Sequence, residues 1–498
     1  MDFRFGTLLG LLAMLLVRAP AITAQKNVAN QGRGVANITS EHVKINFDTA
    51  GHLLKTSNVV KTQKGLRKEN PDKDAVLLSD VIDVPIQQVT PFLALGSRLV
   101  LDNAVDQLSA IQIEIRSLDN TQQWSAWREI KWDTHLTDSK DTLVGRLQFL
   151  SETIATVQFR LVLKRRSASI TGNARLRSLA ISFTSPGATD PKRLKEIQEK
   201  NKEVTLQKEY ESNGKEYPMP DFVSRTDWDC PDGQQPSGPY PLTDVTHQIV
   251  HHSAGTNSTD DWPAVVRAIW DYHVNTNGWS DIGYNWLIDP NGIVYQGRGW
   301  VDGDDEVQGA HFCGTNSNTM GVCLMGNFEE VAPREEAKKS LSNLLAWKSD
   351  EKNIDPLAIQ YHSSSQQNLK TISGHRDGCN TLCPGENLYT QLPQIRNRVK
   401  ELIQESTVPI TKVDSVGNYP NPFRGTTNIT FSLTESGMVR LTVWNIKGQF
   451  IEEVTRRLYS PGSHSELWNA TGYASGIYFC RIDFKGQSIV KKMVLVRR

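Results

Sequence analysis

This sequence has few cysteines, equal numbers of acidic and basic residues, and few long apolar runs. Six cysteines among 498 residues are too few for a disulfide framework, so the fold must depend on buried hydrophobic cores. Lysine plus arginine and aspartate plus glutamate each number 55, so no overall field attracts nucleic acid or acidic lipid. We therefore expect no nucleic-acid partner. A chain of this length predicts about three domains.

The N-terminus carries an apolar run that bears on targeting. Residues 8–17 (LLGLLAMLLV) follow the basic Arg4, and small residues then end at Ala24. A membrane-spanning helix needs ~20 apolar residues, so this run is too short to serve as an anchor. The pattern favours a signal peptide over residues 1–24 rather than a buried first helix. We expect an exported protein with no membrane span once the signal is removed.

Residues 41–185 show the alternation of half-buried strands. Segments such as AIQIEIRSL and TVQFRLVLKR place apolar residues at every second position, and no helical period intervenes. The prediction is an N-terminal β-sandwich. Three tryptophans, at 124, 127 and 132, could stack on sugar rings if exposed, but packing in the core is the commoner use and the one we expect.

The rest of the chain divides by composition. Residues 186–222 mix lysine and glutamate with almost no apolar face, which is typical of a charged linker that is at most transiently helical. Residues 223–402 predict a mixed α/β domain, a central sheet flanked by helices. Its first helix, in DWPAVVRAIWDYHV, is predicted to be amphipathic, and YNWLIDPNGIVYQGRG to form a hairpin turning at Pro290-Asn291-Gly292. Residues 408–498 return to short strands and predict a small immunoglobulin-like sandwich.

Histidines gather in the middle of the chain, where the stretch SGHRDGCNTLCPG also places two cysteines after His375. Glycines and Pro384 make this stretch a loop, which can turn His375 and Cys383 toward one point. Imidazole and thiolate are good zinc ligands, and a third could come from the strand HQIVHHS. Successive strand residues face opposite sides, so the pattern leaves open whether His251 or His252 points inward. Also open are a surface histidine and a disulfide of Cys379 or Cys383.

Five motifs in a fixed order carry a resemblance. IVHHSAG, GWSDIGYNWLIDPNGIVYQGRG, GAHF, MGVCLMGNF and SGHRDGCNTLCPG resemble the zinc-dependent N-acetylmuramoyl-L-alanine amidases of the peptidoglycan recognition protein and phage lysozyme-amidase superfamily. The resemblance covers about residues 223–402. It implies one Zn²⁺ and cleavage of the amide between N-acetylmuramic acid and the first alanine of the stem peptide, with peptidoglycan or muropeptides as partners.

The resemblance also implies a role for each matching residue. His251, His375 and Cys383 would bind zinc, while Tyr284 and Thr381 would be catalytic residues that stabilise the oxyanion. Members of the family without the cysteine bind and do not cut, so Cys383 favours an enzyme. The expected substrate-binding residues are His311, His252 and Trp279.

The sequence departs from the family at two places. An acidic insertion in GRGWVDGDDEVQGAH lies where family members discriminate diaminopimelate from lysine in the stem, so this preference does not transfer. The cysteines other than Cys383 do not match the disulfide of the animal proteins. With Cys383 as a ligand five remain, so at least one has no disulfide partner; Cys323 is the expected buried thiol, and Cys313 could pair with Cys379 or Cys230.

The C-terminal segment has a resemblance of its own. NYPNPF, VRLTVWNIKGQ, ASGIYFCRI and the basic end VKKMVLVRR resemble the sorting domain of type IX secretion substrates. This implies the type IX machinery as a partner and a location outside a Gram-negative bacterium, secreted or at its surface. The whole chain is thus expected to be a secreted peptidoglycan amidase. The alternatives are a surface protein that binds muropeptides without hydrolysis, and a zinc amidase acting on another bond.

Overall fold

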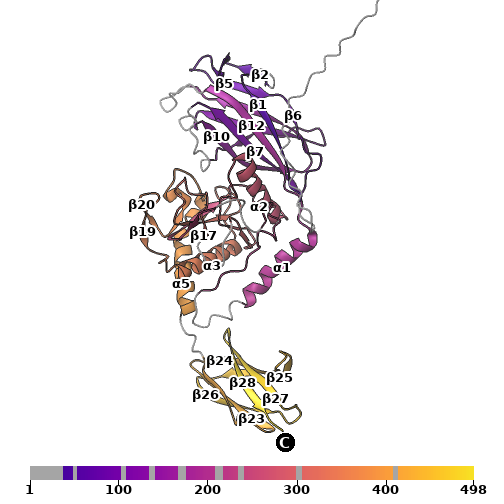
Figure 1. Ribbon diagram of the computed structural model, residues 1–498, viewed down its shortest axis with the longest axis vertical. Coiled ribbons are helices and arrows are strands. Elements are labelled where there is room, and N and C mark those ends of the chain that lie inside the picture. Colours follow the sequence, from indigo (N-terminus) through magenta and orange to yellow (C-terminus); the bar gives the residue numbers. More distant parts are fainter. Residues whose placement is uncertain are drawn as a thin grey trace, which may run out of the picture.

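The structure is a computed structural model that describes residues 37–48, 53–102, 108–133, 141–165, 175–207, 217–233, 240–298, 306–407 and 413–497. The expected signal peptide and residues 299–305 of the acidic insertion lie outside this range. Figure 1 shows the N-terminal strands at one end, a helix-flanked part in the middle and the C-terminal strands at the other end. Across the described residues, no helix is both long and apolar enough to cross a membrane.

Two antiparallel sheets of six strands make up the N-terminal part. Alternation drives them: Ile111, Ile113 and Ile115 of one strand are buried on one face, and Leu93, Leu95 and Leu99 from the other sheet meet them in a common core. The first sheet has the order β10-β7-β12-β4-β3, with β1 also paired to β12. The second has the order β2-β5-β11-β8-β9, with β6 also paired to β11. The strands are β1 (Thr39–Asn46), β2 (Leu53–Ser57), β3 (Val59–Thr62), β4 (Gly65–Lys68), β5 (Ala75–Ser79), β6 (Ile82–Asp83), β7 (Phe92–Leu101), β8 (Ile111–Asp119), β9 (Arg128–Ile130), β10 (Thr142–Ser151), β11 (Ile154–Leu163) and β12 (Arg175–Ser185).

The three tryptophans of this part do not share one environment. Trp132 packs against the core and donates from Nε1 to the carbonyl of Ile111 over 2.7 Å, as predicted. The prediction is wrong for Trp124, which is 36% exposed. Its ring lies under the guanidinium of Arg116 at 4.3 Å, and such cation–π pairing is favourable at the surface.

A mixed five-stranded sheet forms the middle of the molecule, in the order β16-β15-β18-β14-β21. Strands β14, β15, β18 and β21 run parallel and β16 returns antiparallel to β15, as the predicted hairpin requires. Helices α3 and α5 cover one face and α2 the other. The elements are β13 (Leu242–Thr243), β14 (His247–His252), α2 (Trp262–Asp271), β15 (Trp286–Ile288), β16 (Val294–Gln296), β17 (Glu306–Val307), β18 (Thr319–Leu324), α3 (Glu335–Glu351), β19 (Ile359–His362), β20 (Gln367–Lys370), β21 (Ile372–Gly374), α4 (Glu386–Tyr389) and α5 (Leu392–Thr407).

Helix α2 differs from its prediction. A helix with one apolar face should leave the other face in water, yet all ten residues of α2 are buried, Arg267 and Asp271 included. The N-terminal part covers the polar face. Arg267 donates to the carbonyls of Pro186 and Gly187, which follow β12, over 2.8 and 2.7 Å. The sequence pattern was therefore right about the helix and wrong about its exposure.

The expected charged linker contains helix α1 (Pro191–Gln207). Pairs one turn apart, Lys192 with Glu196 and Lys195 with Glu199, support the helix on its exposed side. Ile197 is buried against the middle part.

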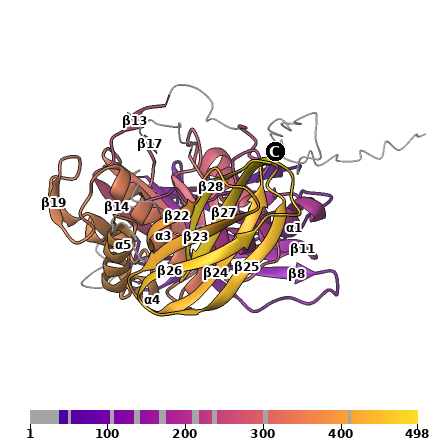
Figure 2. The ribbon, with the colours of Figure 1, turned by 90° about the horizontal axis from the view of Figure 1, so that it is seen from below.

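Two further antiparallel sheets form the C-terminal part, in the orders β22-β23-β26 and β25-β24-β27-β28. Phe431 and Trp468 from one sheet share a core with Leu441 and Ile482 from the other. Figure 2 shows these strands from below, in front of the rest of the molecule. They are β22 (Val413–Tyr419), β23 (Thr426–Leu433), β24 (Gly437–Asn445), β25 (Phe450–Tyr459), β26 (Gly462–Asn469), β27 (Gly476–Phe484) and β28 (Gln487–Leu495).

Candidate metal centre and cleft

The site lies at the carboxyl ends of parallel strands. His251 and His252 end β14, and His375 follows directly after β21, its hydrogen-bonded neighbour. Parallel strands end at the same edge of a sheet, where α/β folds commonly place their ligands. The alternation that the sequence left open is resolved here: His251 pairs with Cys323 in register and lies in the group with His375 and Cys383.

The donor atoms of His251, His375 and Cys383 all lie within 4.8 Å of one another, and all three residues are buried. Zinc bonds of about 2.0 Å to nitrogen and about 2.3 Å to sulfur place tetrahedral donors ~3.5 Å apart. The distance from His251 Nδ1 to Cys383 Sγ is 3.7 Å, and the two imidazole rings are 4.5 Å apart. Two imidazoles and one thiol in this arrangement fit a zinc ion with a fourth position left over.

Burial makes the thiol of Cys383 dependent on a cation. Its side chain is fully buried, and this burial raises its pKa far above the usual value. The backbone N–H of His252 donates to the sulfur over 3.4 Å, which favours the thiolate but does not outweigh burial. A divalent cation at the site would supply the missing positive charge, since metal coordination deprotonates a thiol.

His311 lies behind His251 rather than beside the three donors. Its Nδ1 is 3.0 Å from His251 Nε2, and its Nε2 is 3.3 Å from the hydroxyl of Thr319. A hydrogen bond to the far nitrogen of a ligating imidazole fixes its ring and its tautomer. His311 also lines the cleft, so it is placed both to hold His251 and to meet a substrate.

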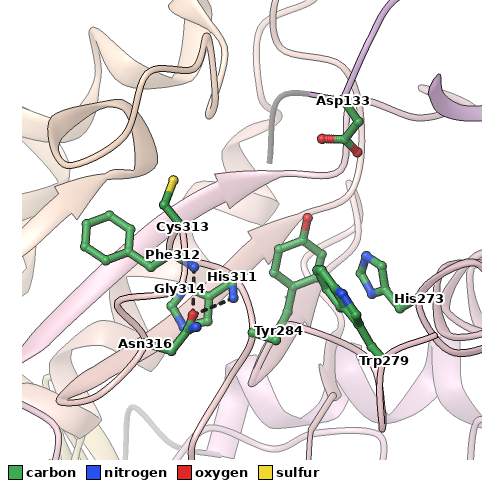
Figure 3. Close-up of a pocket in the computed structure, with 10 residues that line it drawn as sticks. Asp133, His273, Trp279, Tyr284, His311, Phe312, Cys313, Gly314 and Asn316 are labelled. Atoms are coloured by element: carbon green, nitrogen blue, oxygen red, sulfur yellow. Dashed lines mark hydrogen bonds between the residues drawn. The ribbon is translucent and has the colours of Figure 1, made fainter. Parts of the chain in front are cut away.

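Figure 3 shows a cleft whose lining residues include His311 and Cys313. These two residues connect the cleft to the donor group, because His311 Nδ1 is 3.0 Å from His251 Nε2 and Cys313 Sγ is 3.5 Å from His375 Nε2.

Tyr284 lines the cleft, with its ring 5.4 Å from that of His251. Burial, reinforced by Cys323, Cys383 and Asp133, raises the pKa of the Tyr284 phenol well above 10, so the phenol stays protonated and able to donate. Trp279 lines the cleft and stacks on His273 at 4.7 Å.

Five expected site residues are not among those that line the cleft: the three donors, His252 and Thr381. The ring of His252 is buried and accepts from the backbone N–H of Phe328 over 3.2 Å. Thr381 accepts from the backbone N–H of Cys383 over 3.2 Å, on the loop that carries the ligand.

Several cleft residues were not identified from the sequence. His273 lies near the end of the stretch predicted as the helix DWPAVVRAIWDYHV, with no motif of its own, and its Nδ1 accepts from Gly283 N–H over 3.1 Å. Asp133 comes from the N-terminal part and has no motif that could have signalled it. Cys313 lines the cleft and forms a disulfide with Cys379, one of the two pairings left open. The remaining cysteines, at 230, 323, 383 and 480, are buried and not in disulfides.

Comparisons with known proteins single out the middle and the end of the chain. Residues 241–386 match the family model described as N-acetylmuramoyl-L-alanine amidase, and residues 418–496 match that of a secretion system C-terminal sorting domain. Peptidoglycan recognition protein 1 of Bos indicus is 33% identical over 153 residues, which are 30% of this chain and 72% of the relative. Peptidoglycan recognition protein 3 of Homo sapiens is 31% identical over 172 residues, and the match spans 34% of this chain and 45% of that protein.

Two solved structures are similar to part of this chain. The Drosophila peptidoglycan recognition protein SD is 28% identical, with a TM-score of 0.29, over 36% of this chain and 95% of that one. The Drosophila PGRP-LB structure is also 28% identical, with a TM-score of 0.28, over 34% of this chain and 92% of that one.

Proposed function

This chain belongs to the family of N-acetylmuramoyl-L-alanine amidases and peptidoglycan recognition proteins, and on that premise we propose that it is a secreted zinc-dependent peptidoglycan hydrolase. The bond cut is the amide between N-acetylmuramic acid and the L-alanine of the stem peptide. The observation that carries the proposal is the buried group of His251, His375 and Cys383, which contacts the cleft residues His311 and Cys313.

The three donors would hold the ion, and His311 would fix the ring of His251. A zinc ion held by these residues would supply a Lewis acid and would lower the pKa of a water molecule toward ~7. Tyr284, protonated and in the cleft, donates a hydrogen bond to the amide oxygen as negative charge develops on it.

In this proposal a residue that lines the cleft transfers a proton to the departing amine. Tyr284 and His273 are the candidates, because their rings are 5.6 Å apart and both line the cleft. Thr381 acts through the loop of Cys383, whose backbone it holds. Trp279 offers an aromatic wall to the substrate.

The outer parts of the chain give the proposal its setting. We propose that residues 41–185 are a β-sandwich domain, 186–222 a connecting segment, 223–402 the amidase domain and 408–498 an immunoglobulin-like sorting domain. The match over 418–496 supports type IX secretion to the outside or the surface of a Gram-negative cell. The paired sheets with common cores support the two sandwiches.

A binding protein without hydrolysis is the alternative, because the relatives are named as recognition proteins. Cys383 favours the enzyme. Digestion of purified sacculi by the full chain, with and without a chelator, distinguishes the two. Hydrolysis releases stem peptides with a new N-terminal alanine by mass spectrometry, stops with the chelator and returns with zinc. Binding to sacculi with no peptide released under any condition would establish the alternative.

A further inference from the structure

The N-terminal part and the middle part are joined by buried polar contacts. The carboxylate of Asp271 on α2 is fully buried and accepts from the hydroxyls of Ser40 and Thr184 over 2.6 and 2.5 Å. Thr189 donates through its backbone N–H and its hydroxyl to Asp261, the N-cap of the same helix. A buried carboxylate without these donors would cost several kcal/mol, so the contact belongs to the folded state.

Strand β10 of the N-terminal part continues this contact up to the cleft. The hydroxyl of Tyr272 donates to the carbonyl of Gly145 over 2.7 Å. Val144 and Leu147 of β10 pack with Tyr272 and Trp279, and Trp279 lines the cleft. One wall of the cleft is therefore backed by a domain that lies outside the family match at 241–386.

Asp133 reaches into the cleft from this framework. Its backbone N–H donates to the carbonyl of Val144 over 2.7 Å, and its neighbour Trp132 is bridged to Gly145. Figure 3 shows the carboxylate of Asp133 and the hydroxyl of Tyr284 directed into the same space. Among the ten described residues that line the cleft, Asp133 alone carries a carboxylate.

We propose that the N-terminal domain completes the substrate cleft and that Asp133 binds a positively charged amine of the substrate or of the released peptide. The inference rests on the proposed function, since muropeptides then supply the amine. Two amines qualify: the side-chain amine of the stem diamino acid, present in lysine and diaminopimelate alike, and the α-amine of alanine released by hydrolysis. The other described residues that line the cleft carry no carboxylate. The carboxylate of Asp133 therefore favours binding of a protonated amine at its side of the cleft.

The test measures binding apart from catalysis. The full chain carries Cys383→Ser, and calorimetry compares it with the same chain carrying Asp133→Asn. The probes are N-acetylmuramoyl-tripeptide with lysine at stem position three, the same compound acetylated on that amine, and the free tripeptide with and without an acetylated α-amine. Glu129→Gln is the matched control, because Glu129 lies four residues earlier, pairs with Lys131 and is not among the lining residues.

The expected result is a loss of at least about tenfold in affinity with Asp133→Asn, seen only for probes that keep the recognised amine. Whichever acetylation removes the loss identifies the amine. Affinities within twofold for all probes, or an equal loss for acetylated and free probes, overturn the inference and leave the proposed function standing. No binding of any probe to either chain overturns both.

Hydrolysis by the zinc-loaded chain gives a second readout. If the recognised amine is the stem side-chain amine, Asp133→Asn should raise KM about tenfold with kcat changed by less than about twofold, as expected when a contact binds ground state and transition state alike. If it is the α-amine, KM should stay unchanged and inhibition by the free tripeptide should weaken about tenfold. An equal loss in kcat and kcat/KM would mean that Asp133 acts in the chemical step, which contradicts its role as a binding residue.

Discussion

The hydroxyl of Thr184 donates to the carboxylate of Asp271 over 2.5 Å, across the boundary between the N-terminal sheets and helix α2. Both residues are buried, with 3% and 0% of their surfaces exposed. Thr184 lies 87 positions before Asp271 in the chain, so the stability of the middle part depends on a residue of the N-terminal part.

Thr184→Val should therefore destabilise the chain. The substitution keeps the shape of the side chain and removes the donor, and a buried acceptor left without its partner costs about 1–3 kcal/mol. Urea unfolding followed by tryptophan fluorescence measures the change. Ser40→Ala, which removes another of the donors to Asp271, should act in the same direction. A change below about 0.5 kcal/mol for both variants would show that the carboxylate is satisfied by other means.

Cys383→Ser should remove bound zinc and hydrolysis together, because serine replaces the thiolate of the donor group. Metal content by atomic absorption and peptide release from sacculi are the two measurements. Cys230→Ala is the control, since Cys230 is also a buried cysteine of the middle part outside a disulfide. Retention of one zinc per chain by the Cys383 variant would contradict the ligand assignment.

Tyr284→Phe should leave zinc bound and lower kcat by about 10²–10³, the loss typical of one oxyanion donor. Burial raises the pKa of this phenol well above 10, so the group contributes in its protonated form throughout the neutral range. The wild-type rate should consequently show no fall between pH 7 and about 9 that the variant lacks. Such a fall, present in the wild type and missing in the variant, would assign the titration to Tyr284.

Removal of the Cys313–Cys379 disulfide should destabilise the fold without removing the metal. The bridge closes a loop with a sequence separation of 66 residues, for which chain entropy predicts up to about 4 kcal/mol and typical measured values are about 2–4 kcal/mol. A chain with both Cys313→Ala and Cys379→Ala should lose this free energy of unfolding and keep its zinc. Loss of zinc from the folded variant would show that the bridge positions His375, whose Nε2 is 3.5 Å from Cys313 Sγ.

His247 should make the fold sensitive to mild acid. Burial, with the nearby His362, lowers the pKa of His247 to about 4. The unfolded chain binds this proton near pH 6.5, so the free energy of unfolding falls as pH drops from about 6.5 to about 4. His247→Gln should flatten the change in urea midpoint between pH 7 and pH 5. A slope in the His247→Gln variant equal to that of the wild type would contradict the assignment to His247.

The donor group could be predicted from the sequence because its residues stand in short local motifs. His375 and Cys383 share one loop, and HHS ends a strand whose alternation permits only one of its histidines to join them. Which of the two histidines joins the donor group, His251 or His252, depends on how each face of β14 is packed against the rest of the domain. That information lies in the packing of α2 against one face and α3 with α5 against the other.

Contacts between distant parts could not be predicted in this way. The sequence pattern of α2 indicated a helix with one solvent-exposed face. Nothing in that pattern indicated that Ser40 and Thr184 would contact and bury Asp271. Asp133 likewise stands in no motif, and its place in the cleft follows from the hydrogen bond of its backbone to Val144. Periodicity reports which face of an element is apolar, whereas docking of two domains depends on shapes formed far apart in the chain.

The burial of Arg267 against the carbonyls of Pro186 and Gly187 has a consequence for building chimeras. A segment cut to the boundaries of the family match would expose this arginine and Asp271 to water, without the carbonyls of Pro186 and Gly187 and the hydroxyls of Ser40 and Thr184 that meet them here. Transfer of the amidase-like region to another carrier protein therefore requires that the N-terminal sheets be transferred with it. In this chain the exchangeable unit is larger than the region that its relatives have in common.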